Sequence, residues 1–167
     1  MINFGFLLVL YIAFSRLLEL FVSYRNTKQL LKLGAKEHFA FHYYWLVFFH
    51  IIVNIYFLIK SFNVDINFSL SFIIFIILQF LRLKVHIDMG KYWTTRIIVL
   101  ENQPLVNHGL FKHIKHPNYL IVILEIFFLC LIFNDVFGLF VFSTINILLI
   151  LLRISYEEKA NKNRGRF

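Results

Sequence analysis

The chain has 167 residues, of which 60% are hydrophobic and 19% aromatic, and its mean hydropathy is +0.74. A soluble domain of this size cannot bury that much apolar surface, so the composition excludes a soluble globular protein. The net charge of +8 comes from basic residues that gather at the ends of apolar segments and form no separate basic domain. It therefore indicates contact with anionic lipid headgroups and argues against a nucleic-acid partner.

Five apolar segments predict membrane helices, near residues 2–24, 42–60, 66–82, 119–133 and 135–152. These segments must be helical because five of them cannot close a barrel and unpaired backbone groups are costly in lipid. The last two are short, and we expect them to form a tight hairpin around Asn134 and Asp135. The sequence thus predicts one all-α integral membrane domain over residues 1–167, with a cytoplasmic cofactor-binding loop at 83–118 and a C-terminal helical extension at 153–167.

The distribution of Lys and Arg predicts the orientation in the membrane. Outside the predicted helices, residues 25–41 carry four basic residues, 82–118 carry six and 153–167 carry five, whereas the opposite loops carry only Lys60. The positive-inside rule places the basic side in the cytoplasm, with the N-terminus outside and the C-terminus inside. The basic, Ile- and Phe-rich composition with one cysteine, Cys130, fits a bacterial inner membrane.

Three charged residues lie inside the predicted helices, away from their ends. Arg16 and Glu19 stand three apart on one helix face and can pair with each other; the alternative is a contact with substrate or cofactor. Glu125 lies eight residues after Pro117, about 12 Å into the fourth helix. It is either a structural partner of Arg16 or His50, or a substrate-binding residue that lines the active site.

The region between the third and fourth helices contains the most informative motif. Residues 84–93 could continue the third helix beyond the bilayer, and residues 97–100 form a β-rich run. His116-Pro117-Asn118-Tyr119 predicts a helix start, because proline is tolerated at the first helical position. The free N–H groups of that turn attract anions, and Lys112, Lys115 and His116 strengthen the preference. A capped helix with flanking positive charges explains the same pattern.

A second polar motif follows the fifth apolar segment. Arg153 and Glu157 are four residues apart and lie on one face of a helix. The arginine can hold a carboxylate through two parallel hydrogen bonds, and the glutamate can bind an ammonium or a ribose hydroxyl. The structural alternative is a surface ion pair between the two, worth about 0.3–0.5 kcal/mol.

These motifs occur in a fixed order. The apolar pair Leu105-Val106 is followed by Gly109 and the aromatic Phe111. The basic Lys115 then precedes the His-Pro-x-Tyr motif, His116-Pro117-Asn118-Tyr119. After the predicted helical hairpin comes an Arg-x-x-x-Glu motif, formed by Arg153 and Glu157. The combination resembles the isoprenylcysteine carboxyl methyltransferase family of membrane enzymes, which use S-adenosylmethionine. The resemblance covers about residues 90–158 and is greatest to a small bacterial branch of the family.

The resemblance implies methyl transfer to an oxygen, a carboxylate or an enol or phenol, of a lipidic or prenylated acceptor in the membrane. It implies that Arg153 is the catalytic residue and touches the substrate. It further implies a set of cofactor-binding residues: Arg96, Gln103, Pro104, Leu105, Val106, Phe111, His116, Pro117, Asn118, Tyr119 and Glu157. The chain departs from the family pattern at three positions, with Gln103 where histidine is common, Phe111 where tyrosine is common and Lys115 where arginine is common.

The acceptor determines whether a general base is needed. A carboxylate is already ionised at neutral pH and needs none. An enol or phenol would benefit from a base, and His108, His113 and His116 are the candidates.

Two other classes of function compete with this reading. The seven histidines could ligate haem or a metal, through His50 and His86 or through His38 and His42. Glu37 is the one carboxylate near the second pair, which favours a hydrogen-bonding role for those histidines. A non-catalytic membrane adaptor is the third possibility, and it would bind no cofactor.

Overall fold

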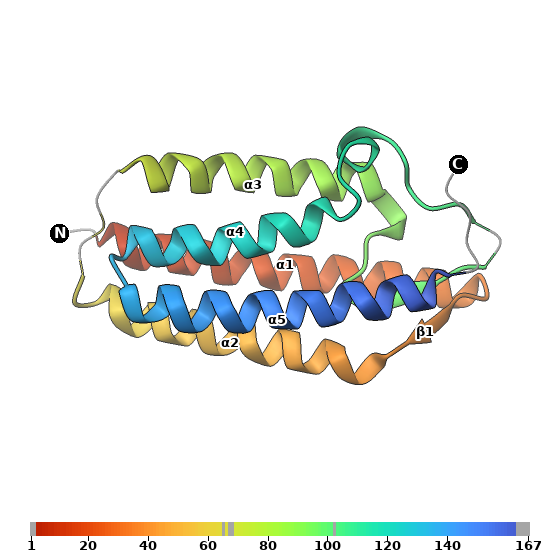
Figure 1. The fold of residues 1–167 in the computed structure, drawn as a ribbon, viewed down its shortest axis with the longest axis horizontal. Helices are drawn as coiled ribbons and strands as arrows, with labels where there is room; N and C mark the ends of the chain where they lie inside the picture. The colour runs from red at the N-terminus through yellow and green to blue at the C-terminus, as the bar shows by residue number, and fades with distance from the viewer. Residues whose placement is uncertain (1–2, 65, 67–68, 102, 163–167) are drawn as a thin grey trace.

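The computed structural model describes residues 3–64, 66, 69–101 and 103–162 (Figure 1). These residues form five α-helices: α1 (Phe4–Lys32), α2 (Ala40–Ser61), α3 (Leu70–Met89), α4 (Pro117–Ile132) and α5 (Val136–Ala160). Two short strands, β1 (Lys36–His38) and β2 (Ile97–Val99), and 3₁₀ turns at Gly90–Tyr92 and Gly109–Lys112 complete the fold. The helices run side by side, with α4 packed against both α3 and α5 and with α1 packed against α2.

The all-α membrane architecture predicted from the sequence is confirmed. Four helices in the described part of the chain are long and apolar enough to cross a bilayer, namely α1, α2, α3 with its following turn, and α5. With 16 residues, α4 is only about 24 Å long, shorter than the roughly 30 Å hydrocarbon core. Large apolar side chains such as Leu17, Phe21 and Phe140 are more than 60% exposed, and lipid is the medium that can cover them.

Three helices extend beyond their apolar segments. The first was expected to end near residue 24 but continues to Lys32, and the fifth was expected to end near residue 152 but continues to Ala160. The third begins at Leu70, later than the expected residue 66, and continues to Met89, as the sequence suggested. Polar residues at this end of the first helix are buried rather than solvated: Ser23, just before the extension, and Asn26, within it, are each only 2% exposed. Tertiary contacts of these residues therefore lengthen the helix beyond the apolar segment.

One end of the bundle, which we call the polar end, holds β1, residues 90–101 and 103–116, and the end of α5 (Figure 1). Here β1 and β2 pair antiparallel, with Glu37 opposite Ile98. The Asn26 amide donates to the Trp93 carbonyl at 2.8 Å, and the Ser23 hydroxyl lies 2.7 Å from that of Thr95. These contacts hold the segment after α3 against the extended end of α1.

The opposite end holds the largest fully buried side chains and the α4–α5 hairpin. Phe57, Phe75 and Phe133 are at most 2% exposed there. The hairpin turns at Asn134, whose positive φ of 49° is compatible with asparagine, as expected for the tight connection. Asp135 caps α5 by accepting from the Gly138 N–H at 2.9 Å, and it pairs with Lys60 of α2 at 2.8 Å.

Candidate active site

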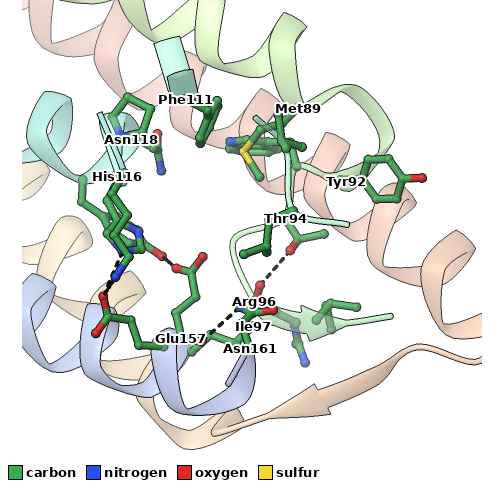
Figure 2. Close-up of a pocket in the computed structure, with 18 of the residues that line it drawn as sticks. Met89, Tyr92, Thr94, Arg96, Ile97, Phe111, His116, Asn118, Glu157 and Asn161 are labelled. Carbon is green, nitrogen blue, oxygen red and sulfur yellow. Dashed lines mark hydrogen bonds and ion pairs between the residues drawn. The ribbon is translucent and has the colours of Figure 1, made fainter. Parts of the chain in front are cut away.

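A pocket of about 380 Å³ opens at the polar end, between the start of α4, the end of α5 and the segments around β2 (Figure 2). We call it the polar-end pocket. Its wall combines apolar residues of the loops with polar residues of α4 and α5: Met89, Tyr92, Trp93, Thr94, Arg96, Ile97, Ile98, Leu100, Pro104, Leu105, Val106, Asn107, Phe111, Lys115, His116, Pro117, Asn118, Tyr119, Arg153, Glu157, Glu158 and Asn161, with Leu30 of α1. An apolar surface beside clustered polar groups is typical of sites for small ligands.

The first turn of α4 supplies one wall. Pro117 occupies the first helical position after His116, as the motif predicted. The side-chain oxygen of Asn118 and the Nε2 atom of His116 are buried and have no hydrogen-bond partner among the described residues. The nearest carboxylate oxygen to His116 Nε2, on Glu158, is 3.6 Å away, beyond hydrogen-bonding distance. Unpaired buried polar atoms are costly, so this wall suits a polar ligand.

Arg153 and Glu157 are joined through a third residue. The Arg153 Nε–H donates to the Tyr119 hydroxyl at 2.9 Å, and the Tyr119 hydroxyl is hydrogen-bonded to the Glu157 carboxylate. A guanidinium can only donate, so the tyrosine accepts from Arg153 and donates to Glu157. Arg153 is 6% exposed, and no direct ion pair links it to Glu157 in the described chain. The pair is therefore not the surface ion pair that was its structural alternative.

Most of the predicted site residues lie together in the polar-end pocket. Eleven of them line it: Arg96, Pro104, Leu105, Val106, Phe111, His116, Pro117, Asn118, Tyr119, Arg153 and Glu157. Gln103 does not line the pocket; its side-chain oxygen is 3.4 Å from the Tyr92 hydroxyl at the surface. Glu125 lies deeper in the bundle, away from this pocket.

The guanidinium of Arg96 is paired with other side chains of the protein. Its guanidinium lies 2.9 Å from the Glu37 carboxylate and 4.7 Å from the ring centre of Tyr43. Burial lowers the pKa of this group, but the Glu37 carboxylate more than offsets that effect, and the net pKa of Arg96 is raised. The residue therefore joins β2 to β1 and α2 while its stem lines the pocket.

Sequence reasoning missed several lining residues. Trp93 and Thr94 carry no motif, and they reach the pocket because α1 holds their segment in place. Asn161 could have been predicted from its spacing, since it lies four residues after Glu157 and so on the same helix face. Ile97 lies in the β-rich run that was noted without a role.

A second cavity, of about 400 Å³, lies between α1 and α2 within the apolar part of the bundle, and we call it the membrane groove. Its walls are mainly apolar side chains of those two helices: Val9, Leu10, Ala13, Leu17, Leu20, Leu46, Val47, Ile51, Ile55 and Leu58. The groove and the polar-end pocket share five lining residues, which are Trp93, Thr94, Asn118, Tyr119 and Arg153. The two cavities therefore meet at the start of α4.

Four charged side chains form a buried cluster beneath this junction. Arg16 pairs with Glu19 at 3.2 Å, as predicted, and with Glu125 at 2.7 Å. Arg82 bonds to both carboxylates, to Glu125 at 2.7 Å and to Glu19 at 2.6 Å through Nη2. Of the two roles considered for Glu125, the structure shows the pairing with Arg16. Arg82 was counted with the charges outside the helices, but it lies within α3 and is 7% exposed.

The candidate histidine pairs do not assemble a metal centre in the described chain. His38 lies in β1 and His42 in α2, so the two do not share one helix face. Among the described residues, no group of three or more His, Cys, Asp and Glu side chains is placed to hold a metal ion.

The bundle and its two cavities define a helical membrane protein with a polar ligand pocket that meets an apolar groove at one end. The sequence model of the isoprenylcysteine carboxyl methyltransferase (ICMT) family matches residues 70–162, and the chain belongs to this family. It is accordingly a membrane methyltransferase.

Two curated proteins resemble the chain over nearly its whole length. An uncharacterised protein of Bacillus subtilis, YpbQ, is 30% identical over 158 residues, which cover 92% of this chain and 94% of the relative. An uncharacterised protein of Haemophilus influenzae is 28% identical over 166 residues, with 95% and 94% covered. No solved structure matches the chain.

Proposed function

We propose that the protein uses S-adenosylmethionine to methylate an oxygen of a lipidic acceptor that lies in the membrane. The observation that carries the proposal is the junction of the polar-end pocket with the membrane groove at Asn118, Tyr119 and Arg153. A polar cofactor and an apolar acceptor need separate cavities that meet where the group is transferred. Family membership supports methyl transfer as the reaction.

The residues of the polar-end pocket fit the parts of the cofactor. The volume of about 380 Å³ is in the range of small-ligand sites. Glu157 and Asn161 can bind hydroxyl groups of the ribose, and the apolar side chains of Ile97, Leu105 and Val106 can cover the base. The positive N-terminal end of α4 suits the cofactor's carboxylate. The unpaired polar atoms of His116 and Asn118 provide further sites for its polar groups.

When bound, S-adenosylmethionine supplies the methyl group of its sulfonium. The rest of the cofactor leaves as a neutral thioether, so no acid is needed. The chain's own task is therefore to align the acceptor and to exclude water. Arg153 is buried, and its one hydrogen bond in the described chain is the one from Nε to Tyr119. Its terminal nitrogens can hold an acceptor carboxylate with two parallel hydrogen bonds.

An enol or phenol acceptor would transfer its proton to a base. Of the three candidate histidines, His116 lines the polar-end pocket, whereas His108 and His113 do not. We therefore propose His116 as the base for acceptors of this kind.

The proposed topology follows the positive-inside rule. The polar end carries most of the Lys and Arg and faces the cytoplasm, with the N-terminus outside, in a bacterial inner membrane. The acceptor reaches the groove from the lipid, and the cofactor reaches the pocket from the cytoplasm.

Calorimetry of the detergent-purified protein with S-adenosylmethionine and with its demethylated product tests the proposal. We expect both to bind, and Glu157→Ala to weaken binding about 10- to 100-fold because it removes hydrogen bonds to a charged group. Arg153→Ala should mainly lower turnover. Lys159→Ala is the control, because Lys159 belongs to the same helix but does not line the pocket. No binding of either compound by folded protein would rule out S-adenosylmethionine as the methyl donor.

A further inference from the structure

The apolar wall of the membrane groove contains a small polar recess. The recess has a volume of about 20 Å³ and shares Arg16, His50 and Asn54 with the groove. These residues belong to α1 and α2, the helices that otherwise give the groove its apolar lining. Polar side chains at this depth are costly in a membrane protein unless they have a partner or a function.

Two polar groups at the recess have no hydrogen-bond partner among the described residues. The Asn54 amide nitrogen donates to the His50 carbonyl at 2.8 Å, which leaves the Asn54 side-chain oxygen free. No hydrogen bond involves that oxygen or the imidazole of His50 within the part of the chain that the structure describes. Glu125, at the back of the recess, already has partners, because it accepts from Arg16, Arg82 and Gln79 at 2.7, 2.7 and 2.9 Å.

Charge and size limit what the recess can accept. The two arginines of the buried cluster balance its two glutamates, so an additional charged group would find no counterion there. A volume of about 20 Å³ holds roughly one water-sized group. A single hydroxyl, which donates to the Asn54 side-chain oxygen and accepts from the His50 imidazole N–H, satisfies both limits.

The depth of the recess can be estimated along two helices. His42 packs against Tyr156, on the turn that carries Arg153, at 5.3 Å between ring centres. His50 lies eight residues further along α2, which is about 12 Å deeper. Along α4, Asn118 and Glu125 are seven residues apart, or about 10 Å.

We propose that the acceptor carries a second, uncharged hydrogen-bonding group, a hydroxyl, about 10–12 Å from the oxygen that is methylated. His50 and Asn54 recognise this group, while the apolar side chains of the groove cover the chain between the two polar points. The inference rests on the proposed function, because it takes the groove as the site of the acceptor.

A matched pair of ligands tests the inference. Binding of stearic acid and of 10-hydroxystearic acid is measured with the full-length protein in detergent in the presence of S-adenosylmethionine. The hydroxyl adds one hydrogen bond at the depth of the recess, so we expect the hydroxylated acid to bind about three- to tenfold more tightly. In the His50→Phe and Asn54→Leu variants, the affinities for stearic acid and 10-hydroxystearic acid should become equal. Ile55→Ala, which changes an apolar lining residue of α2, should weaken both acids alike and keep their ratio.

The outcomes separate this inference from the proposed function. Equal affinities in the unmodified protein, or a preference that survives both recess variants, would overturn the recess as a recognition site. If neither acid binds while S-adenosylmethionine does, the groove is not the acceptor site and the inference fails, but the cofactor assignment stands. Failure of S-adenosylmethionine itself to bind would instead defeat the proposed function. Cofactor binding by each variant verifies that it is folded.

Discussion

The Tyr119 hydroxyl donates to the Glu157 carboxylate while it accepts a hydrogen bond from the Arg153 Nε–H at 2.9 Å. Tyr119 itself is buried, and its ring stacks on that of His116 with the ring centres 5.4 Å apart. One hydroxyl thus fixes the side chains proposed to hold the acceptor and the cofactor. The two ligand sites share a single, directed hydrogen-bond chain.

Tyr119→Phe keeps the ring and removes this hydroxyl. We expect kcat/KM to fall about 10-fold or more, because two hydrogen bonds to charged groups are lost and Glu157 and Arg153 are freed to move. S-adenosylmethionine affinity should fall as well. Steady-state kinetics and calorimetry measure the two effects, with His113→Ala as the control at an exposed position outside the pocket. An unchanged kcat/KM would show that the hydroxyl does not position either residue.

Gly109 allows the loop that carries Phe111 to close against α3. Its φ is +58°, and a Cβ atom there would lie 2.0 Å from Oδ2 of Asp88, which accepts from the Leu110 N–H at 3.2 Å. Gly109→Ala should therefore displace the loop and weaken cofactor binding several-fold, beyond the roughly 1 kcal/mol cost of the backbone conformation. Calorimetry with S-adenosylmethionine measures the effect.

Gly34→Ala is the matched control for that substitution. Gly34 also has a positive φ, of 89°, but nothing lies within 4 Å of the position of its Cβ atom, and it does not line the pocket. It should lower stability by about 1 kcal/mol and leave cofactor affinity unchanged. Equal losses of affinity in both variants would show that backbone strain alone, and not contact with Asp88, explains the result.

The buried cluster predicts a strong asymmetry between single and double substitutions. Arg82→Leu leaves Glu19 and Glu125 with only Arg16 as an arginine partner, so it should destabilise the protein by about 3–5 kcal/mol. Arg82→Leu combined with Glu19→Leu restores the balance of charge and should cost less than Arg82→Leu alone. Thermal unfolding in detergent measures both. A double variant less stable than the single one would contradict a cluster governed by charge balance.

Asp135 predicts a dependence of stability on pH at the end of the bundle far from the site. Burial raises the pKa of this carboxyl, but the Gly138 N–H and the Lys60 ammonium more than offset it, and the net pKa is lowered. A lowered pKa in the folded state means that the carboxylate stabilises the protein above its ordinary pKa of 3.8, and that this stabilisation is lost as the pH falls through the lowered value.

Asp135→Asn tests that dependence, because asparagine can still cap α5 but cannot pair with Lys60. We expect the variant to be less stable by about 1 kcal/mol near neutral pH, and the difference to shrink as the pH falls below 3.8 and to disappear below the lowered pKa of Asp135. Asp135→Ala also loses the cap and should remain less stable in acid. Melting temperatures across this pH range provide the measurement. A difference between wild type and Asp135→Asn that is constant with pH would show that Lys60 contributes nothing.

The helices and the pocket were predictable from local signals. Apolar segment length predicted the helices, Pro117 marked the start of α4, and the four-residue spacing of Arg153 and Glu157 put both on one face. The membrane groove was not predictable, because its walls come from α1 and α2 and meet Trp93 and Thr94 only through the tertiary fold. The same is true of Arg82, whose position after an apolar run looks like a membrane boundary. Its burial depends on Glu19 and Glu125, which are 63 and 43 residues away in sequence.

The brevity of α4 has a consequence for how a lipid would react. At about 24 Å, α4 starts well below the level that α1 and α5 reach at the polar end (Figure 1). The polar-end pocket and the membrane groove meet at this start of α4, so in the proposed reaction the reacting atoms would meet deeper in the bundle than the ends of α1 and α5. An acceptor could then be methylated while it stays within the lipid. The water-soluble S-adenosylmethionine is the reactant that has to enter the protein to this depth.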